Sequence, residues 1–281
     1  MTIRNFYALV FKAIMVLSTV LVVLFLFSII WTIISKGLPY LTWDMVTKIP
    51  EGGFYIGKGG GILNAIIGSA YITLGATIIG LLVSIPVVLY LNIYAKKGSW
   101  LGQTIRMAAD VLFGIPSIVY GAFAFTLMIY LGIHTSLLAG IIAVSFLVVP
   151  IMVRAMDEVI RLAPDDLYNV IYSMGTTRLE ASWVILRQSV SGILTAILLS
   201  FGRAIGDAAS VLFTAGYTDN IPTSLEQPAA TLPLAIFFQL SSPIEEVQGR
   251  AYASALILTI IVLTISFLSK FISNQFSKFK I

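Results

Sequence analysis

The sequence predicts an all-α membrane protein with six transmembrane helices. Of its 281 residues, 58% are hydrophobic and only 11% are charged, whereas soluble domains carry about 25% charged residues. The mean hydropathy is +0.99. The apolar residues form charge-free windows, and several of these exceed the roughly 20 residues that a helix needs to cross a bilayer. Together these observations indicate an integral membrane protein.

The charge-free windows place the helices in order. The first contains 23 uncharged residues, 13–35, which is longer than a signal-peptide core, so we expect a retained helix. The window 111–153 has 43 residues, too many for one helix, and LGIHTS at 131–136 divides it. We therefore expect helices near 10–35, 62–94, 107–131, 136–154, 188–214 and 251–271.

Three parts follow from this order. Residues 1–61 hold the first helix and an external loop, residues 62–275 hold a core of five helices, and residues 276–281 form a short cytoplasmic tail. The core contains one sizeable internal connection at 154–187. An external segment, 217–250, carries the apolar stretch LPLAIFFQL, which is expected either to re-enter the membrane edge or to pack over the pore.

Basic residues indicate the orientation. With six spans both termini lie on one side, and that side holds twelve of the Lys and Arg residues against four on the other. By the positive-inside rule the termini are cytoplasmic. The twelve are Arg4, Lys12, Lys96, Lys97, Arg106, Arg154, Arg161, Arg178, Arg187, Lys270, Lys278 and Lys280.

The composition excludes several kinds of site. The chain has no cysteine and a single histidine, so it has no disulfide, no thiolate and no expected His-rich metal site. The net charge of +4 does not indicate a nucleic-acid partner, because most basic residues lie beside apolar spans.

Two charged residues interrupt the fifth predicted span. Arg203 and Asp207, in SFGRAIGDAASVLF at 200–213, are the only charges from Gln188 to Gly216. Four residues apart on a helix, they share a face and can pair. An arginine at mid-membrane costs about 2.5–3.5 kcal/mol on insertion scales, so this face is expected to point into the protein or a water-filled path. A structural ion pair and an anion-contacting pair both remain open; a guanidinium suits tetrahedral oxyanions such as phosphate.

The connection 154–187 predicts two helices. Pro164 with Asp165 and Asp166 forms a helix start, and apolar residues recur at helical spacing up to Met174. Gly175 ends this amphipathic helix, and a second helix begins around Leu179. The first helix either lies on the membrane surface or docks on a cytoplasmic partner.

This connection resembles the EAA loop of ABC importer permeases. Gly175 matches the central glycine of that motif, while its Glu-Ala-Ala falls on Asn169, Val170 and Ile171, and its closing proline falls on Arg187. The acid, the small residues and the proline are therefore missing. The resemblance implies a coupling loop that docks on an ATPase subunit through Asp165, Asp166, Asn169, Gly175, Thr176 and Arg178.

Further stretches are similar to phosphate-specific ABC importer permeases of the PstA type. GRAIGDAASVLFTAG at 202–216 resembles their Arg-Ala-Ile-Gly-Glu-Thr signature, with Asp207 in place of Glu. GKGGGILNAIIGS at 57–69, GIPSIVYGAF at 114–123 and EQPAATLPLAIF at 226–237 match in the same order. The resemblance implies the type I, MetI-like fold, a cell (inner) membrane location and phosphate import, with Arg203 and Asp207 in the substrate pathway.

The same resemblance implies partners. These are a paralogous permease chain in a heterodimer, two ATP-binding cassette ATPase subunits and an extracytoplasmic phosphate-binding protein, all at the lipid bilayer. The chain is then no enzyme and binds no cofactor, and ATP with Mg²⁺ belongs to the ATPase subunits.

Several alternatives stay open. The permease could carry another oxyanion, namely molybdate, tungstate or sulfate. A stand-alone secondary transporter or channel is disfavoured because Asp207 is the only acid inside a predicted span and because 154–187 is organised. A structural or sensory membrane subunit is the third alternative.

Overall fold

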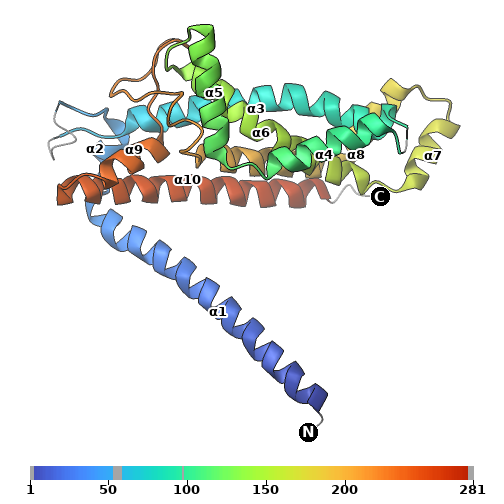
Figure 1. Cartoon of the computed structure of the whole chain (residues 1–281), viewed down its shortest axis with the longest axis horizontal. Helices are drawn as coiled ribbons and strands as arrows, with labels where there is room; N and C mark the ends of the chain where they lie inside the picture. Colours follow the sequence, from blue (N-terminus) through green and yellow to red (C-terminus); the bar gives the residue numbers. More distant parts are fainter. Residues whose placement is uncertain (1–2, 53–58, 97, 278–281) are drawn as a thin grey trace.

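The computed structural model describes residues 3–52, 59–96 and 98–277, and in these ranges it is helical, without a strand (Figure 1). Five helices are long and apolar enough to cross a membrane, and one bent pair raises the number to six. The α-helices are α1 (Ile3–Gly37), α2 (Trp43–Thr47), α3 (Leu63–Leu89), α4 (Trp100–Phe113), α5 (Ser117–Leu131), α6 (Leu137–Arg161), α7 (Asp165–Ser173), α8 (Arg178–Ile205), α9 (Leu232–Leu240) and α10 (Glu245–Ser277).

The bundle is built around α6, which packs on α3, α4, α5 and α8. Most of its apolar span is buried inside the protein. Gly80 of α3 permits close approach, because a Cβ there would lie 2.9 Å from the side chains of Val148 and Met152. Small residues at helix contacts let backbones pack tightly where lipid offers no hydrophobic driving force.

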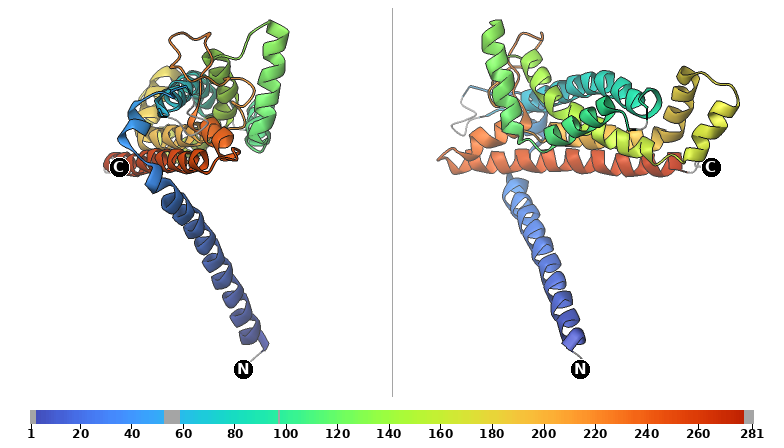
Figure 2. Two further views of the ribbon diagram at one scale, coloured as in Figure 1. Left: turned by 90° about the vertical axis from the view of Figure 1, so that its left-hand side faces the viewer. Right: turned by 45° about the vertical axis from the view of Figure 1, so that its right-hand side comes forward.

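The first helix stands apart from the bundle. α1 diverges from α10 in all three views, and its apolar window has no buried residue (Figures 1 and 2). It joins the bundle at Gly37, where a Cβ would lie 2.6 Å from the carbonyl oxygen of Tyr252. From this junction α1 extends toward the end of the molecule that carries α7 and the C-terminus (Figure 1).

The prediction of a single helix for the third span, 107–131, is wrong. It is divided into α4 and α5, which meet at an angle of 102°. The break falls at Gly114–Pro116, and Pro116 precedes the first residue of α5. A proline lacks the N–H that a continuous helix needs and disfavours helical geometry at the preceding residue, so the chain turns here. The bend carries α5 across the long axis of the bundle (Figure 2).

The fifth predicted span is displaced. α8 runs from Arg178 to Ile205, so the second helix of the 154–187 connection and the fifth span are one continuous helix. Beyond Gly206 the chain is not helical until α9, which packs on α10 and α3. The fourth span is longer than expected, since α6 extends to Arg161.

Candidate functional site

Arg203 lies in the last turn of α8 and is exposed. Within the described part of the chain its guanidinium makes neither an ion pair nor a hydrogen bond. The neighbouring residue Gly202 is open as well, because a Cβ added there would meet no atom within 4 Å. Among the described residues no other helix therefore covers the GxxxG pair Gly202 and Gly206, and the close helix contact that the spacing permits is not made there.

A cavity of about 570 Å³ adjoins Arg203. Four helices enclose it, and the guanidinium is the only charged group of its lining. The hydroxyls of Thr195 and Ser266 donate to carbonyl oxygens of their own helices, each at 2.8 Å. An anion in this cavity would therefore meet Arg203 as its principal partner. The lining residues are Phe113, Ile151, Thr195, Leu198, Leu199, Gly202, Arg203, Val262, Ser266 and Ser269.

Asp207 does not pair with Arg203, contrary to the sequence-based expectation. α8 ends at Ile205, so the two residues do not share a helical face. The Asp207 carboxylate instead accepts hydrogen bonds from the backbone N–H of Ser210, at 2.8 Å, and from its hydroxyl. Aspartate commonly bonds to backbone a few residues ahead and so competes with helix continuation. The half-buried carboxylate thus fixes the turn that follows α8.

That turn leads into the buried part of the bundle. Ser210 and Thr214 are fully buried, and the Thr214 carbonyl accepts a hydrogen bond from the Ser136 N–H at 3.0 Å, at the start of α6. α5 crosses the turn at Gly121, where a Cβ would lie 2.6 Å from the Ala209 carbonyl oxygen. Gly121 belongs to the stretch GIPSIVYGAF, and its close contact explains why a glycine stands there.

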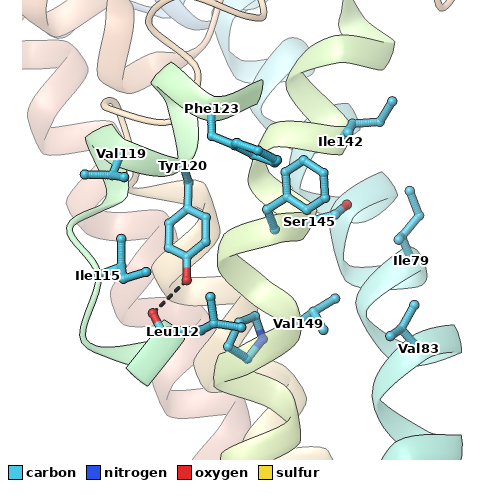
Figure 3. A pocket seen from close by; sticks show the side chains of 12 residues that line it. Ile79, Val83, Leu112, Ile115, Val119, Tyr120, Phe123, Ile142, Ser145 and Val149 are labelled. Atoms are coloured by element: carbon cyan, nitrogen blue, oxygen red, sulfur yellow. Dashed lines mark hydrogen bonds between the residues drawn. The ribbon is translucent and has the colours of Figure 1, made fainter. Parts of the chain in front are cut away.

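A second cavity, of about 580 Å³, lies between α5 and the α3–α6 pair (Figure 3). Its walls are almost entirely apolar. Figure 3 shows Tyr120 turned toward Leu112, whose carbonyl oxygen accepts the phenol hydrogen bond at 2.6 Å. Ser145 is likewise bonded to the carbonyl of Ile141, at 2.6 Å. With no free donor on these groups the cavity is unsuited to an anion.

The predicted amphipathic helix is present as α7. It starts after Pro164 with Asp165 in its first turn and ends before Gly175, whose φ is +75°. Ile171 is buried against the core, whereas Asp166 and Asn169 are exposed. α7 lies at the extremity of the molecule (Figure 1), where a partner could reach its outer face.

Two residues assigned to the coupling loop make contacts within the chain. The hydroxyl of Thr176 donates to the carbonyl oxygen of Ile171 at 2.8 Å. Arg178 donates to the Tyr94 carbonyl oxygen at 3.4 Å and lies over its ring, 5.9 Å from the centroid. Thr177 and Glu180 form a capping box that starts α8. These contacts stabilise the turn after α7 and join the start of α8 to Tyr94.

A polar cluster near the α7 end escaped the sequence analysis. The expectation that Asp207 is the only acid inside a span is wrong, because Asp207 lies beyond the end of α8 and α6 contains both Asp157 and Glu158. Asp157 is buried. Its carboxylate accepts hydrogen bonds from the Arg106 Nε at 2.8 Å and Nη2 at 3.2 Å, and from the Asn92 side chain at 2.7 Å. Asn92 lies in a π-helical turn, Tyr90–Tyr94, a feature frequent at functional sites.

Comparison with known proteins adds to this geometry. A family model described as "Binding-protein-dependent transport system inner membrane component" matches residues 84–279. The chain is 37% identical over 262 residues to the phosphate transport system permease protein PstA of Yersinia pestis, covering 92% of this chain and 88% of that protein. The PstA of Xylella fastidiosa (strain Temecula1) is 38% identical over 237 residues, covering 84% and 81%.

An archaeal relative and a solved structure complete the comparison. The probable PstA of Methanocaldococcus jannaschii is 32% identical over 270 residues, covering 94% of this chain and 92% of that protein. An inward-facing structure of the MetNI methionine ABC transporter superposes with a TM-score of 0.63 at 17% identity, covering 76% of this chain and 95% of that one. At this identity the likeness concerns the fold, which is that of a MetI-like permease.

Proposed function

Because the chain belongs to the family of binding-protein-dependent transport system inner membrane components, we propose that it is the permease subunit of an ATP-driven importer that moves inorganic phosphate into the cytoplasm. The relatives at 37% and 38% identity are phosphate transport permeases by name. Members of the family are membrane subunits, and this chain has several helices suited to that role.

Arg203 is the observation that carries the proposal within the structure. Its guanidinium has no partner in the described chain and adjoins a cavity whose lining has no carboxylate. An unpaired guanidinium inside a membrane protein is costly unless water or an anion meets it. The planar guanidinium can donate two parallel hydrogen bonds to a phosphate group, whereas the ammonium group of a lysine acts only as a point charge. We assign Arg203 to contact with the passing anion.

We also assign Asp207 to the proposed pathway, although it does not form an ion pair with Arg203 in this structure. In this structure Ser210 binds its carboxylate, which leaves Arg203 available to phosphate. If the Ser210 contact opens during transport, Asp207 lies close enough in the chain to compete for the guanidinium. Asp207 would then tune release of the anion.

The proposed partners account for the open surfaces. The uncovered face around Gly202 and the unburied α1 suit contact with a paralogous permease chain in a heterodimer. α7 suits docking of an ATPase subunit, and two such subunits would bind the ATP and Mg²⁺. A phosphate-binding protein would dock at the opposite end, where residues 217–250 lie. In this arrangement the α7 end and both termini are cytoplasmic, as the distribution of basic residues indicates.

Uptake of radiolabelled phosphate tests the proposal. Cells that express this chain with its partner subunits should take up phosphate, and ATPase subunits should co-purify with it. An excess of unlabelled phosphate should abolish the signal, whereas equal sulfate, molybdate or tungstate should leave most of it. Inhibition by one of those oxyanions in preference to phosphate would assign the permease to that ion. Uptake that persists without any ATPase subunit would instead indicate a secondary transporter.

A further inference from the structure

The end of the bundle that carries α7 holds a third cavity, of about 680 Å³. It lies apart from the Arg203 cavity and shares no lining residue with it. Six segments contribute: the π-helical turn, the loop after it, α4, the end of α6, the connection after α6, and α7. Its lining consists of Leu91, Asn92, Ile93, Ala95, Lys96, Gly98, Arg106, Arg161, Ala163, Tyr168, Asn169 and Tyr172.

The charges of this lining have one sign. Lys96, Arg106 and Arg161 are cations, and none of the lining residues is a carboxylate. In the described part of the chain Lys96 and Arg161 make no ion pair or hydrogen bond, and both are exposed. Three cations that converge on one cavity repel one another, and a bound anion would relieve this repulsion.

Hydrogen bonds fix two nitrogen atoms of the Arg106 guanidinium. Its Nε and Nη2 bond to the Asp157 carboxylate, and Nη2 also donates to the Leu91 carbonyl oxygen at 3.1 Å. Its Nη1 has no acceptor in the described chain and remains available. The side chain is 32% exposed, so the guanidinium is fixed without being sealed off.

The neighbouring acids line a different, smaller cavity. Asp157, Asp110 and Glu158 line a separate cavity of about 110 Å³, where Asp110 and Glu158 form ion pairs with Arg154. Arg106 and Arg161 border both cavities. Arginine side chains thus neutralise the acids of the small cavity. The lining of the larger cavity stays positive and also presents the amides of Asn92 and Asn169.

We propose that the larger cavity binds a phosphoryl oxyanion, which joins α7 to α4 and α6. Lys96, Arg106 and Arg161 would supply charge-assisted hydrogen bonds, the strongest class for phosphate. The same chemistry is offered by free inorganic phosphate and by the headgroup of an anionic phospholipid. Because α7 reaches α8 and the core through few contacts besides Ile171, the occupant would fix the position of α7. The inference is independent of Arg203 and of the transported ion.

Binding to the full chain in lipid nanodiscs tests this site. One arm uses phosphatidylcholine discs with radiolabelled inorganic phosphate, and the other uses discs with phosphatidylglycerol, whose retention is read by native mass spectrometry. The double variant Lys96→Gln/Arg161→Gln removes two cations that make no ion pair or hydrogen bond with any described residue, so it should fold normally. It should weaken binding by about tenfold or more, because hydrogen bonds to charged groups dominate the affinity. Arg187→Gln is the matched control, since Arg187 is exposed on α8 outside the cavity.

The two arms distinguish the sources. Loss of inorganic phosphate binding in the double variant, with Arg187→Gln unaffected, assigns the site to free phosphate; the same pattern for phosphatidylglycerol assigns it to a lipid headgroup. The idea is wrong if neither ligand binds, or if the double variant and Arg187→Gln behave alike. The Arg203→Ala chain should retain, in both arms, the component of binding that the Lys96→Gln/Arg161→Gln variant loses. Loss of that component in Arg203→Ala would place the anion in the Arg203 cavity and overturn the proposal.

Discussion

Asp157 of α6 and Arg106 of α4 form a two-point ion pair, with Nε–Oδ2 at 2.8 Å and Nη2–Oδ1 at 3.2 Å. Only 8% of the Asp157 side chain is exposed. Removing the Asp157 carboxylate leaves the Arg106 guanidinium, whose side chain is 32% exposed, and the Asn92 amide without their acceptor. We therefore expect Asp157→Ala to lower the free energy of unfolding by about 3 kcal/mol. Thermal unfolding of the purified chain in detergent measures the change.

The control for this prediction is Asp44→Ala, which breaks the exposed pair with Lys48, where the side chains are 63% and 51% exposed. Exposed pairs contribute about 0–1 kcal/mol, so this variant should unfold close to the wild type. An equal decrease in the free energy of unfolding in the two variants would show that the Arg106–Asp157 pair stabilises the fold no more than an exposed pair does.

Arg203 variants should lose transport without losing the fold. Arg203 is exposed and makes no ion pair or hydrogen bond with the residues that the structure describes, so neither Arg203→Ala nor Arg203→Lys should unfold the bundle. Both should reduce phosphate uptake by about tenfold or more, because a lysine cannot offer the planar two-point contact. Initial rates of labelled phosphate uptake measure this effect, with Arg187→Ala as the exposed control on the same helix. Normal uptake in both Arg203 variants would remove Arg203 from the pathway.

Asp207 should couple to Ser210 and not to Arg203 in the resting protein. A double-mutant cycle for stability with Asp207→Ala and Ser210→Ala should give an interaction energy of about 0.5–2 kcal/mol, since the two side chains are in contact. The cycle with Asp207→Ala and Arg203→Ala should give less than about 0.5 kcal/mol. A large interaction energy in the second cycle would restore the direct ion pair.

Gly121 should tolerate no side chain. A Cβ there would lie 2.6 Å from a backbone oxygen of Ala209, so α5 or the turn after α8 must shift. We expect Gly121→Ala to destabilise the chain by about 1–3 kcal/mol, the usual cost of overpacking. Gly202→Ala is the matched helical control. Its Cβ would meet open space, and alanine favours a helix by about 1 kcal/mol, so stability should stay equal or rise.

Gly175 should matter for coupling to the ATPase. Its φ of +75° strains any residue with a side chain, while no atom lies within 4 Å of an added Cβ. Gly132 has the same properties, with φ +68°, at the end of α5. Gly175→Trp and Gly132→Trp should lose similar stability, but only Gly175→Trp should uncouple phosphate uptake from ATP hydrolysis. Intact uptake with the ATPase still bound in Gly175→Trp would mean that α7 is not the docking element.

Local signals accounted for most of the apolar helices and for the helix in the connection 154–187. Charge-free windows placed four apolar helices, α1, α3, α6 and α10, near their observed positions, because a bilayer admits few charges whatever the packing. Pro164 and Gly175 bounded α7, because proline suits a helix start and only glycine readily adopts positive φ at its end. Arg203 was a candidate from the sequence alone, because an arginine in an apolar stretch is costly in lipid whatever surrounds it; its role in transport stays a prediction.

The remaining features depend on contacts between distant residues. Arg106 and Asn92 meet Asp157 across 51 and 65 positions, a separation that no periodicity reveals. The end of α8 was decided by Ser210, which takes the Asp207 carboxylate, and by Gly121, which brings α5 onto the next turn. The amino-acid sequence by itself thus determined which segments enter the membrane, because transfer into lipid is a sum over local residues. Tertiary structure alone decided which charges are paired and which are free, because pairing depends on where separate helices meet.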